Sequence, residues 1–151
     1  MTMIEAKRLL AVLFVLLTAV GVAACGSDSG SSDGDTGNPE VEGVTWQVMN
    51  LATQGAATSL PAGVEAPTLE ISDGMAQVFA GCNSGSGEVQ VNEQTLDFGP
   101  IAMTKKSCGP VENQIEFLVN KVLQGEVTYE VNADGNLVIE RKGNSLVYTP
   151  G

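Results

Sequence analysis

One segment of the chain has the hydrophobic period of a helix, whereas the apolar residues around it alternate with the period of β-strands. Six apolar residues lie three or four positions apart, on one stripe of an α-helix. They are Val111, Ile115, Leu118, Val119, Val122 and Leu123. Pro110 suits the first helical position, Glu112 the positive end of the helix dipole, and Gly125 the position just past the end. The sequence therefore predicts a single helix with one buried face.

The residues before this helix predict strands. Residues 44–49 alternate with a period of two and place Trp46 on the buried face. Asp73-Gly74 supplies the positive φ angles of a tight turn and predicts a hairpin over residues 68–80. Residues 88–98 predict a second hairpin with its tip at 92–94, and a short strand is expected at 101–104.

The residues after the helix predict three more strands. Asp134-Gly135 and Gly143-Asn144 mark two turns within residues 127–149, so these strands follow one another as antiparallel neighbours. Residues 51–67 show no period and are expected to form an irregular connection. The fold class that follows is α+β and mainly antiparallel β: a curled β-meander with a single packed α-helix.

The first residues predict a signal for export. Lys7 and Arg8 precede an apolar run over residues 9–24, about 24 Å long as a helix and shorter than the hydrocarbon core of about 30 Å. The run ends in Val22-Ala23-Ala24-Cys25, which resembles the bacterial lipobox, so Cys25 is the predicted lipidation site. The alternative is an ordinary cleavage site beside an incidental cysteine.

Three segments follow from this interpretation. Residues 1–24 form a lipoprotein signal peptide that is removed. Residues 25–42 comprise the lipidated cysteine and a flexible, acidic Gly/Ser linker, because Val41 is the only large apolar residue in the stretch that follows Cys25. Residues 43–150 form one folded domain. The expected location is the extracytoplasmic face of the cell membrane, with the lipid as anchor.

The charge of the chain restricts its partners. From Cys25 onward there are 17 Asp and Glu against five Lys and Arg. This charge repels phosphate backbones, so nucleic-acid binding is not expected. A cationic envelope protein is a possible partner, although a charge kept for solubility explains the same composition.

With Cys25 assigned to lipid, Cys82 and Cys108 remain. In an exported domain two remaining cysteines most simply form a disulfide. A metal site is the weaker alternative, because the chain has no His and no Cys-x-x-Cys. A catalytic thiol is also weaker, because its usual base is His, although Lys105 and Lys106 could lower a thiol pKa.

The chain also lacks the residues of the common catalytic sites. Without His there is no Ser-His-Asp triad and no base of neutral pKa. Carboxylates could act in pairs, and a solvated surface explains them equally well. The candidates are Glu112 with Glu116, and Glu70, Asp73 and Glu88. No catalytic residue, metal ligand or cofactor is assigned, and the domain is expected to be a monomer.

The order of these features resembles the META domain family, the HslJ-like bacterial lipoproteins. The likeness covers residues 44–149. It is carried by Trp46, Gly81-Cys82-Asn83, Gly87, Ile101-Ala102-Met103-Thr104, Cys108, Phe117-Leu118, Leu137 and Leu146. The resemblance implies that Cys82 and Cys108 approach each other and that one helix packs on a curled antiparallel meander. Gly85 stands where the family usually has an aromatic residue, and Lys106 where it often has Met.

The function expected from these features is that of an exported, membrane-anchored lipoprotein whose domain binds a protein or envelope component without catalysis. The resemblance adds a link to envelope stress, but it implies no reaction. An acidic inhibitor of a cationic envelope-directed hydrolase is the alternative, since the charge would steer it. An enzyme that uses carboxylates or a thiol pair ranks third.

Overall fold

The folded part of the chain begins earlier than the sequence predicts. The computed structural model describes residues 40–151, so the predicted signal peptide, Cys25 and most of the predicted linker lie outside the described residues. Val41, assigned to the linker from sequence, is completely buried in the core. Its carbonyl accepts the indole N–H of Trp46 at 2.9 Å. A flexible segment could not supply this contact, so Val41 belongs to the domain.

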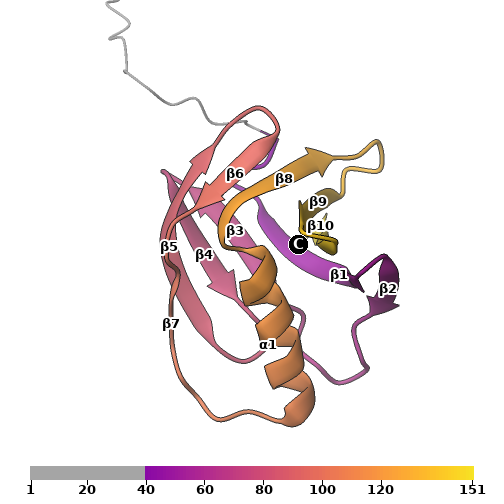
Figure 1. The fold of residues 1–151 in the computed structure, drawn as a ribbon. Coiled ribbons are helices and arrows are strands. Elements are labelled where there is room, and N and C mark those ends of the chain that lie inside the picture. Colours follow the sequence, from indigo (N-terminus) through magenta and orange to yellow (C-terminus); the bar gives the residue numbers. More distant parts are fainter. Residues whose placement is uncertain (1–39) are drawn as a thin grey trace, which may run out of the picture. The chain divides into compact units, whose positions relative to one another are not determined.

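Ten strands and one helix make up the described residues (Figure 1). The strands are β1 (Thr45–Thr53), β2 (Ala56–Ser59), β3 (Thr68–Ser72), β4 (Met75–Phe79), β5 (Ser84–Val91), β6 (Thr95–Phe98), β7 (Ala102–Met103), β8 (Gly125–Val131), β9 (Leu137–Arg141) and β10 (Asn144–Pro150). The helix, α1 (Pro110–Val122), stands between β7 and β8. All strand pairs are antiparallel, so the predicted α+β class with mainly antiparallel strands is confirmed.

The sheet closes on itself, which differs in detail from the predicted curled meander. Neighbours along the sheet run β10-β9-β8-β6-β5-β4-β3-β1, and β1 also pairs with β10 from Trp46 opposite Pro150 to Thr53 opposite Asn144. These eight strands therefore form a barrel-like ring. The pairing joins segments about 100 residues apart in sequence, and no local pattern marks such a contact.

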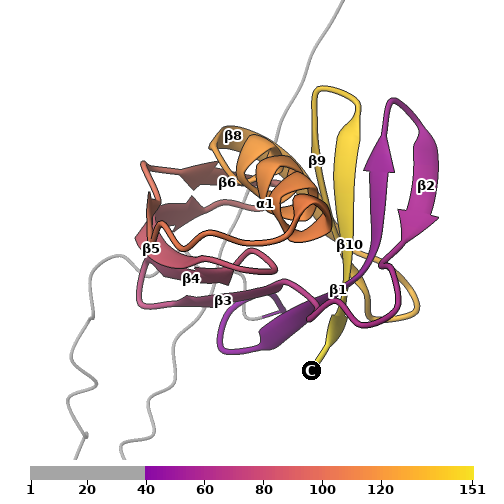
Figure 2. The same ribbon diagram turned by 90° about the horizontal axis from the view of Figure 1, so that it is seen from below.

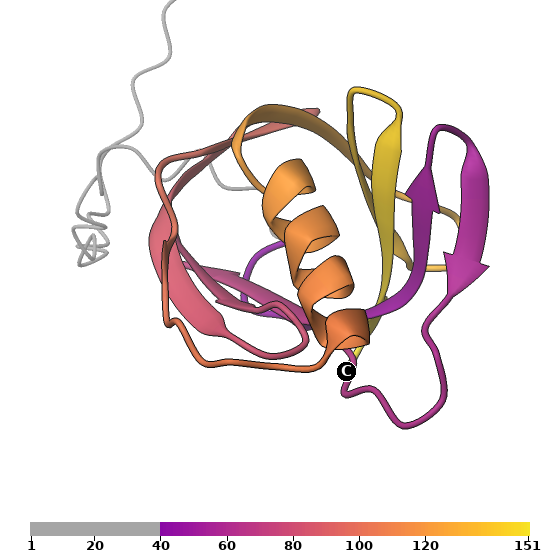
Figure 3. The same ribbon diagram turned by 60° about the horizontal axis from the view of Figure 1, so that its bottom comes forward.

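The helix α1 packs on the concave side of this ring (Figures 2 and 3). It buries Ile115, Val119 and Val122, as the predicted stripe requires. Val111, which the sequence places on the same stripe, is 43% exposed, because it lies at the edge of the stripe near the start of the helix. Phe117 on the outer side of the helix is 68% exposed.

The first half of the region predicted as an irregular connection is a hairpin. β1 continues to Thr53 and turns through Gln54 and Gly55, with φ of 51° and 81°, into β2. Positive φ at both central residues is the geometry of a type I′ turn. All four residues of β2 are exposed, so the strand has no buried face and leaves no hydrophobic alternation in the sequence.

The Ser/Gly stretch after Cys82, which reads as a loop, is the first half of β5. Its glycines let the segment of residues 100–103 approach closely. A Cβ on Gly87 would lie 2.8 Å from the carbonyl oxygen of Pro100. Two residues earlier, Gly85 pairs with Met103 of β7. The glycines here serve close packing of backbones rather than flexibility.

The four predicted hairpin turns are present in the structure, with residues 92–94 connecting β5 to β6 and the Asp134-Gly135 turn connecting β8 to β9. Asp73 and Gly74, with φ of 52° and 71°, connect β3 to β4 as predicted. The turn between β9 and β10 uses Lys142 and Gly143, with φ of 50° and 75°, so it lies one residue earlier than predicted. Asn144 is therefore the first residue of β10 and is buried.

The core holds one phenol without a hydrogen bond. Tyr148 is 1% exposed, and its hydroxyl has no hydrogen-bond partner among residues 40–151. Burial raises the pKa of this phenol above its ordinary value. Tyr129, by contrast, donates its hydroxyl to the carbonyl oxygen of Asn92 at 2.8 Å. The two tyrosines therefore contribute to stability in different ways.

We expect Tyr148→Phe to leave the free energy of unfolding unchanged or raise it by up to about 1 kcal/mol, because it removes an unsatisfied buried hydroxyl. Tyr129→Phe, the matched control, should lower the free energy of unfolding by about 1 kcal/mol.

The pKa of Tyr148 is higher in the folded state than in the unfolded state. The contribution of this group to the free energy of unfolding is therefore complete below about pH 10 and is lost as the pH rises further. Urea unfolding at pH 7 and at alkaline pH measures both effects. A Tyr148→Phe variant as alkali-sensitive as the parent would contradict this account.

Candidate functional site

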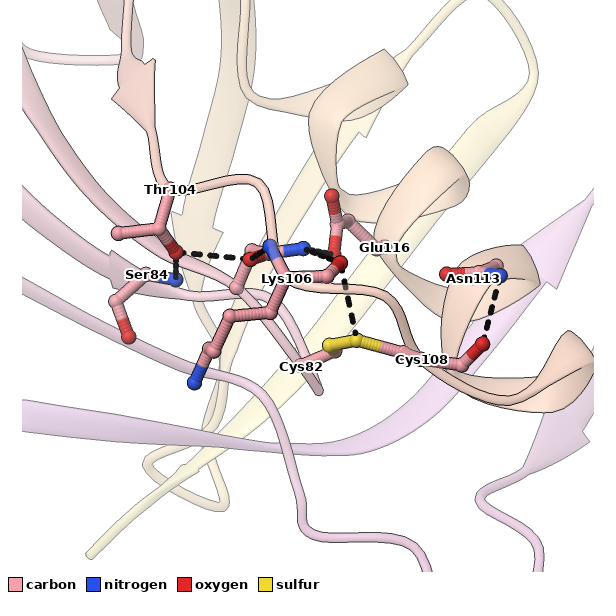
Figure 4. Close-up of a disulfide and its surroundings, with 8 residues drawn as sticks. Cys82, Ser84, Thr104, Lys106, Cys108, Asn113 and Glu116 are labelled. Carbon is pink, nitrogen blue, oxygen red and sulfur yellow. Dashed lines mark hydrogen bonds between the residues drawn. A yellow bond between two sulfur atoms is a disulfide. The ribbon is translucent and has the colours of Figure 1, made fainter.

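Asn83 holds three segments of the chain together with one buried side chain. Figure 4 labels its partners Thr104, Lys106 and Glu116. Its Oδ1 accepts the backbone N–H of Lys106 at 2.7 Å and the hydroxyl of Thr104 at 2.8 Å. Its Nδ2 donates to Glu116 Oε2 at 2.9 Å and to the carbonyl of Lys106 at 3.3 Å. Asn83 is 3% exposed, so its amide is shielded from water, whereas its partners lie at the partly exposed edge of the network. An amide has two donor and two acceptor positions, and here each is used.

A disulfide lies beside this network. Cys82 and Cys108 are joined, with their Cα atoms 6.3 Å apart, within the ordinary range for a disulfide. The pairing is the one predicted from composition and from the family resemblance. Cys108 is two residues before α1, and its carbonyl accepts Asn113 Nδ2 of the helix at 3.2 Å. The disulfide therefore ties the start of the helix to the connection between β4 and β5.

Gly81 gives this connection its shape. Its φ is +94°, and a Cβ at this position would lie 3.3 Å from Cγ2 of Ile115 on the helix. Both the backbone angle and the close approach of the helix favour glycine. The Gly-Cys-Asn step is thus explained residue by residue: a tight turn, a covalent link and a hydrogen-bonded core amide.

The far end of the helix is also fixed. The guanidinium of Arg141 on β9 donates to the carbonyl of Lys121 at 3.2 Å, where a positive charge also suits the negative end of the helix dipole. Together with the contacts at Cys108 and Glu116, this bond sets the position of α1 on the sheet. The helix is therefore a rigid wall for any surface that it lines.

Two of the predicted carboxylates have hydrogen-bond partners in the structure. Glu116 is engaged by Asn83, and Glu70 accepts the hydroxyl of Thr45 at 3.2 Å. Within residues 40–151, no three His, Cys, Asp or Glu side chains gather so that they could hold a metal ion. Over the same residues no helix has both the length and the apolar character needed to cross a membrane.

A groove of about 330 Å³ lies between α1 and the β1–β2 hairpin. Its lining is uncharged, and it mixes apolar side chains with hydroxyl and amide groups. β1 and β2 contribute Leu51, Thr53, Thr58 and Ser59, the connection after β2 contributes Pro61, and the helix contributes Val111, Gln114, Ile115 and Leu118. A groove of this size and composition fits a few side chains of a partner rather than a charged group.

The sequence identifies only part of this groove. The helical stripe includes Val111, Ile115 and Leu118, but it assigns them to the core. The opposite wall lies in the region predicted as an irregular connection. Gly55 was the available signal, because Gly adopts the positive φ of a two-residue hairpin turn, but Gln54 before it is not one of the residues that favour such a turn. Without a hydrophobic alternation on either side, that signal alone does not predict a strand.

The comparison with protein families assigns this fold. The META domain matches residues 39–150. The chain belongs to the META domain family. The match begins two residues before the buried Val41, in agreement with the earlier start of the domain. A comparison with curated proteins finds no match to the chain.

Two solved structures are similar to this META domain protein. One is an NMR structure of a protein from Burkholderia xenovorans, with 22% identity, a TM-score of 0.61, and coverage of 82% of this chain and 95% of that one. The other, also an NMR structure, has 18% identity and a TM-score of 0.58 and covers 74% of this chain and 92% of that one. At this level of identity the likeness concerns the fold alone.

We predict that Asn83→Ala lowers the free energy of unfolding by about 2 to 3 kcal/mol, because it leaves the Lys106 N–H and the Glu116 carboxylate without their buried partner. Asn92→Ala is the matched control. Its side chain makes one long bond, to Thr95 Oγ1 at 3.4 Å, in an exposed turn, so the change should stay within about 0.5 kcal/mol. Denaturant unfolding measures both. Equal losses of unfolding free energy in the two variants would show that the hydrogen bonds of Asn83 do not hold the three segments together.

Proposed function

We propose that this META domain protein is an exported lipoprotein, anchored through Cys25 to the extracytoplasmic face of the membrane, whose domain binds a protein partner without catalysing a reaction. The anchor is supported by the sequence of residues 9–25, where an apolar run ends in two small residues and a cysteine. Residues 26–39 contain no large apolar side chain and would serve as a tether.

The groove between α1 and the β1–β2 hairpin is the observation that carries the binding role. It combines partly exposed apolar side chains with a helical wall, α1, which is held in place by the hydrogen bonds of Asn83 and by the disulfide. Its lining offers apolar surface and hydroxyl groups but no group that titrates near neutral pH. Such a surface is suited to recognition, since rigid walls reduce the entropy lost on binding.

The charge of the domain favours a cationic partner. Residues 40–151 carry 14 Asp and Glu against five Lys and Arg. This excess would steer a basic protein toward the domain and weaken with ionic strength. A cationic envelope-directed hydrolase inhibited by the domain is therefore the second candidate. It differs from a simple receptor in that binding would slow the partner's reaction.

The anchor predicts how the protein fractionates. Membranes washed in high salt should retain the parent chain until detergent is added, because a lipid anchor does not depend on charge. Cys25→Ala should abolish this retention. The matched control is Cys82→Ala with Cys108→Ala, which removes the other two cysteines and should stay on the membrane. A Cys25→Ala chain retained like the parent would contradict lipidation at this residue.

The binding role predicts a specific partner in cells. Crosslinking of the intact protein, followed by mass spectrometry, should enrich one saturable protein over a chain ending at residue 39, which keeps the predicted anchor and lacks the domain. Reduced activity of a captured hydrolase in the presence of the domain would favour the inhibitor. If nothing rises above the truncated control, the domain does not act by binding a protein.

A further inference from the structure

The strand β2 is an open edge of the sheet. Among the described strands, it pairs only with β1, over the four positions from Asn50 opposite Ser59 to Thr53 opposite Ala56. The ring closes without β2, because β10 covers the other side of β1. One side of β2 therefore has no neighbouring strand in the domain, as its position at the rim in Figure 3 also shows.

The free backbone groups of this edge can be assigned. Thr53 and Ala56 flank the two-residue turn, and in such hairpins this pair is hydrogen-bonded. Alternation along antiparallel strands then directs the N–H and C=O groups of Ala57 and Ser59 away from β1. The N–H of Gln54, donated at 2.7 Å to Gly143 on the opposite side of β1, fits the same alternation. The edge thus presents two donors and two acceptors.

Nothing in the sequence of β2 protects this edge. Exposed edge strands are commonly blocked by Lys, by Pro or by a bulge that turns the edge away. β2 reads Ala-Ala-Thr-Ser and has none of these residues. Its side chains are small, so a strand could approach along its whole length.

The free edge adjoins the apolar groove. Thr58 lies opposite Leu51 on β1, and both residues line the groove. Side chains of an added strand that lie on the same face as Thr58 would extend this lining beyond β2, on the groove side of the sheet. Val111, which is 43% exposed, lies on α1 at the opposite wall of the groove. Main-chain groups and apolar contacts would therefore be available to one ligand.

We propose that β2 accepts an extended segment of a partner protein as an additional strand, with apolar side chains toward the groove and basic side chains outward. This inference rests on the proposed binding function and names its surface and its ligand. Backbone bonds to Ala57 and Ser59 would supply affinity, and the groove would select apolar residues at alternate positions. The acidic excess of the domain favours basic residues at the remaining positions.

The probe is a display library of short random peptides, selected on the full chain in detergent. We expect enriched peptides to alternate apolar and basic residues and to shift the NMR amide signals of β2 and of residues 111–118. Ala57→Pro removes one N–H of the free edge and leaves the hydrogen bonds between β1 and β2 in place. It should weaken binding of an enriched peptide about tenfold or more.

Ala133→Pro is the matched control. Ala133 occupies the second position of an exposed turn closed by the Gly135 N–H and the Asn132 carbonyl at 2.9 Å, a position that proline favours. This variant should bind enriched peptides like the parent. The two variants thus separate a general effect of proline from the loss of the edge.

Three results would overturn the proposal. They are the absence of any enriched peptide, peptides whose binding resists Ala57→Pro, and a chain that dimerises through β2 so that a second copy occupies the edge. A partner captured in cells without peptide binding would leave the proposed function intact and reject this surface. Peptide binding at β2 without a captured partner would retain the edge as a strand acceptor and reject the wider function.

Discussion

The hydrogen bonds of Asn83 link β5, the segment before the helix and the helix itself through one buried amide. In a protein interior, such bonds are strong when complete and costly when one partner is missing. A displacement of any of the three segments would leave at least one group unsatisfied. The amide therefore acts together with the Cys82–Cys108 link, which restricts the same segments covalently. The position of α1, and of the groove that it lines, depends on both.

Barrel closure and the open edge have a common origin in β1. Its first residues pair with β3, whereas Asn50 to Thr53 pair with β2 on the same side, and β10 covers the opposite side throughout. The register with β10 shifts between Val48 and Asn50, as at a β-bulge, and bulges bend strands and increase their twist. The second half of β1 thereby departs from β3 and pairs with β2 instead, while it stays paired with β10. The same strand completes the barrel and exposes an edge beside the helix.

Local sequence patterns predict the parts of this structure in which apolar residues recur with the regular period of a helix or a strand, or in which a turn has typical residues. The helix and the Asp73-Gly74 hairpin follow from spacing and turn chemistry, and the cysteine pair follows from the predicted export. β2 escapes prediction because it is exposed on both faces, and the start of β5 because its glycines serve close packing. The pairing of β1 with β10 and the bonds of Asn83 join residues distant in sequence. No single-sequence pattern specifies such contacts.

The size of the open edge limits what it can contribute alone. Two donors and two acceptors on Ala57 and Ser59, with a groove of about 330 Å³, are few contacts for a stable complex. A membrane anchor would change this balance, because a partner held at the same membrane meets the domain at a raised effective concentration. Weak strand addition would then suffice for binding a partner at the same membrane. On this argument the proposed lipid on Cys25 contributes to affinity as well as to location.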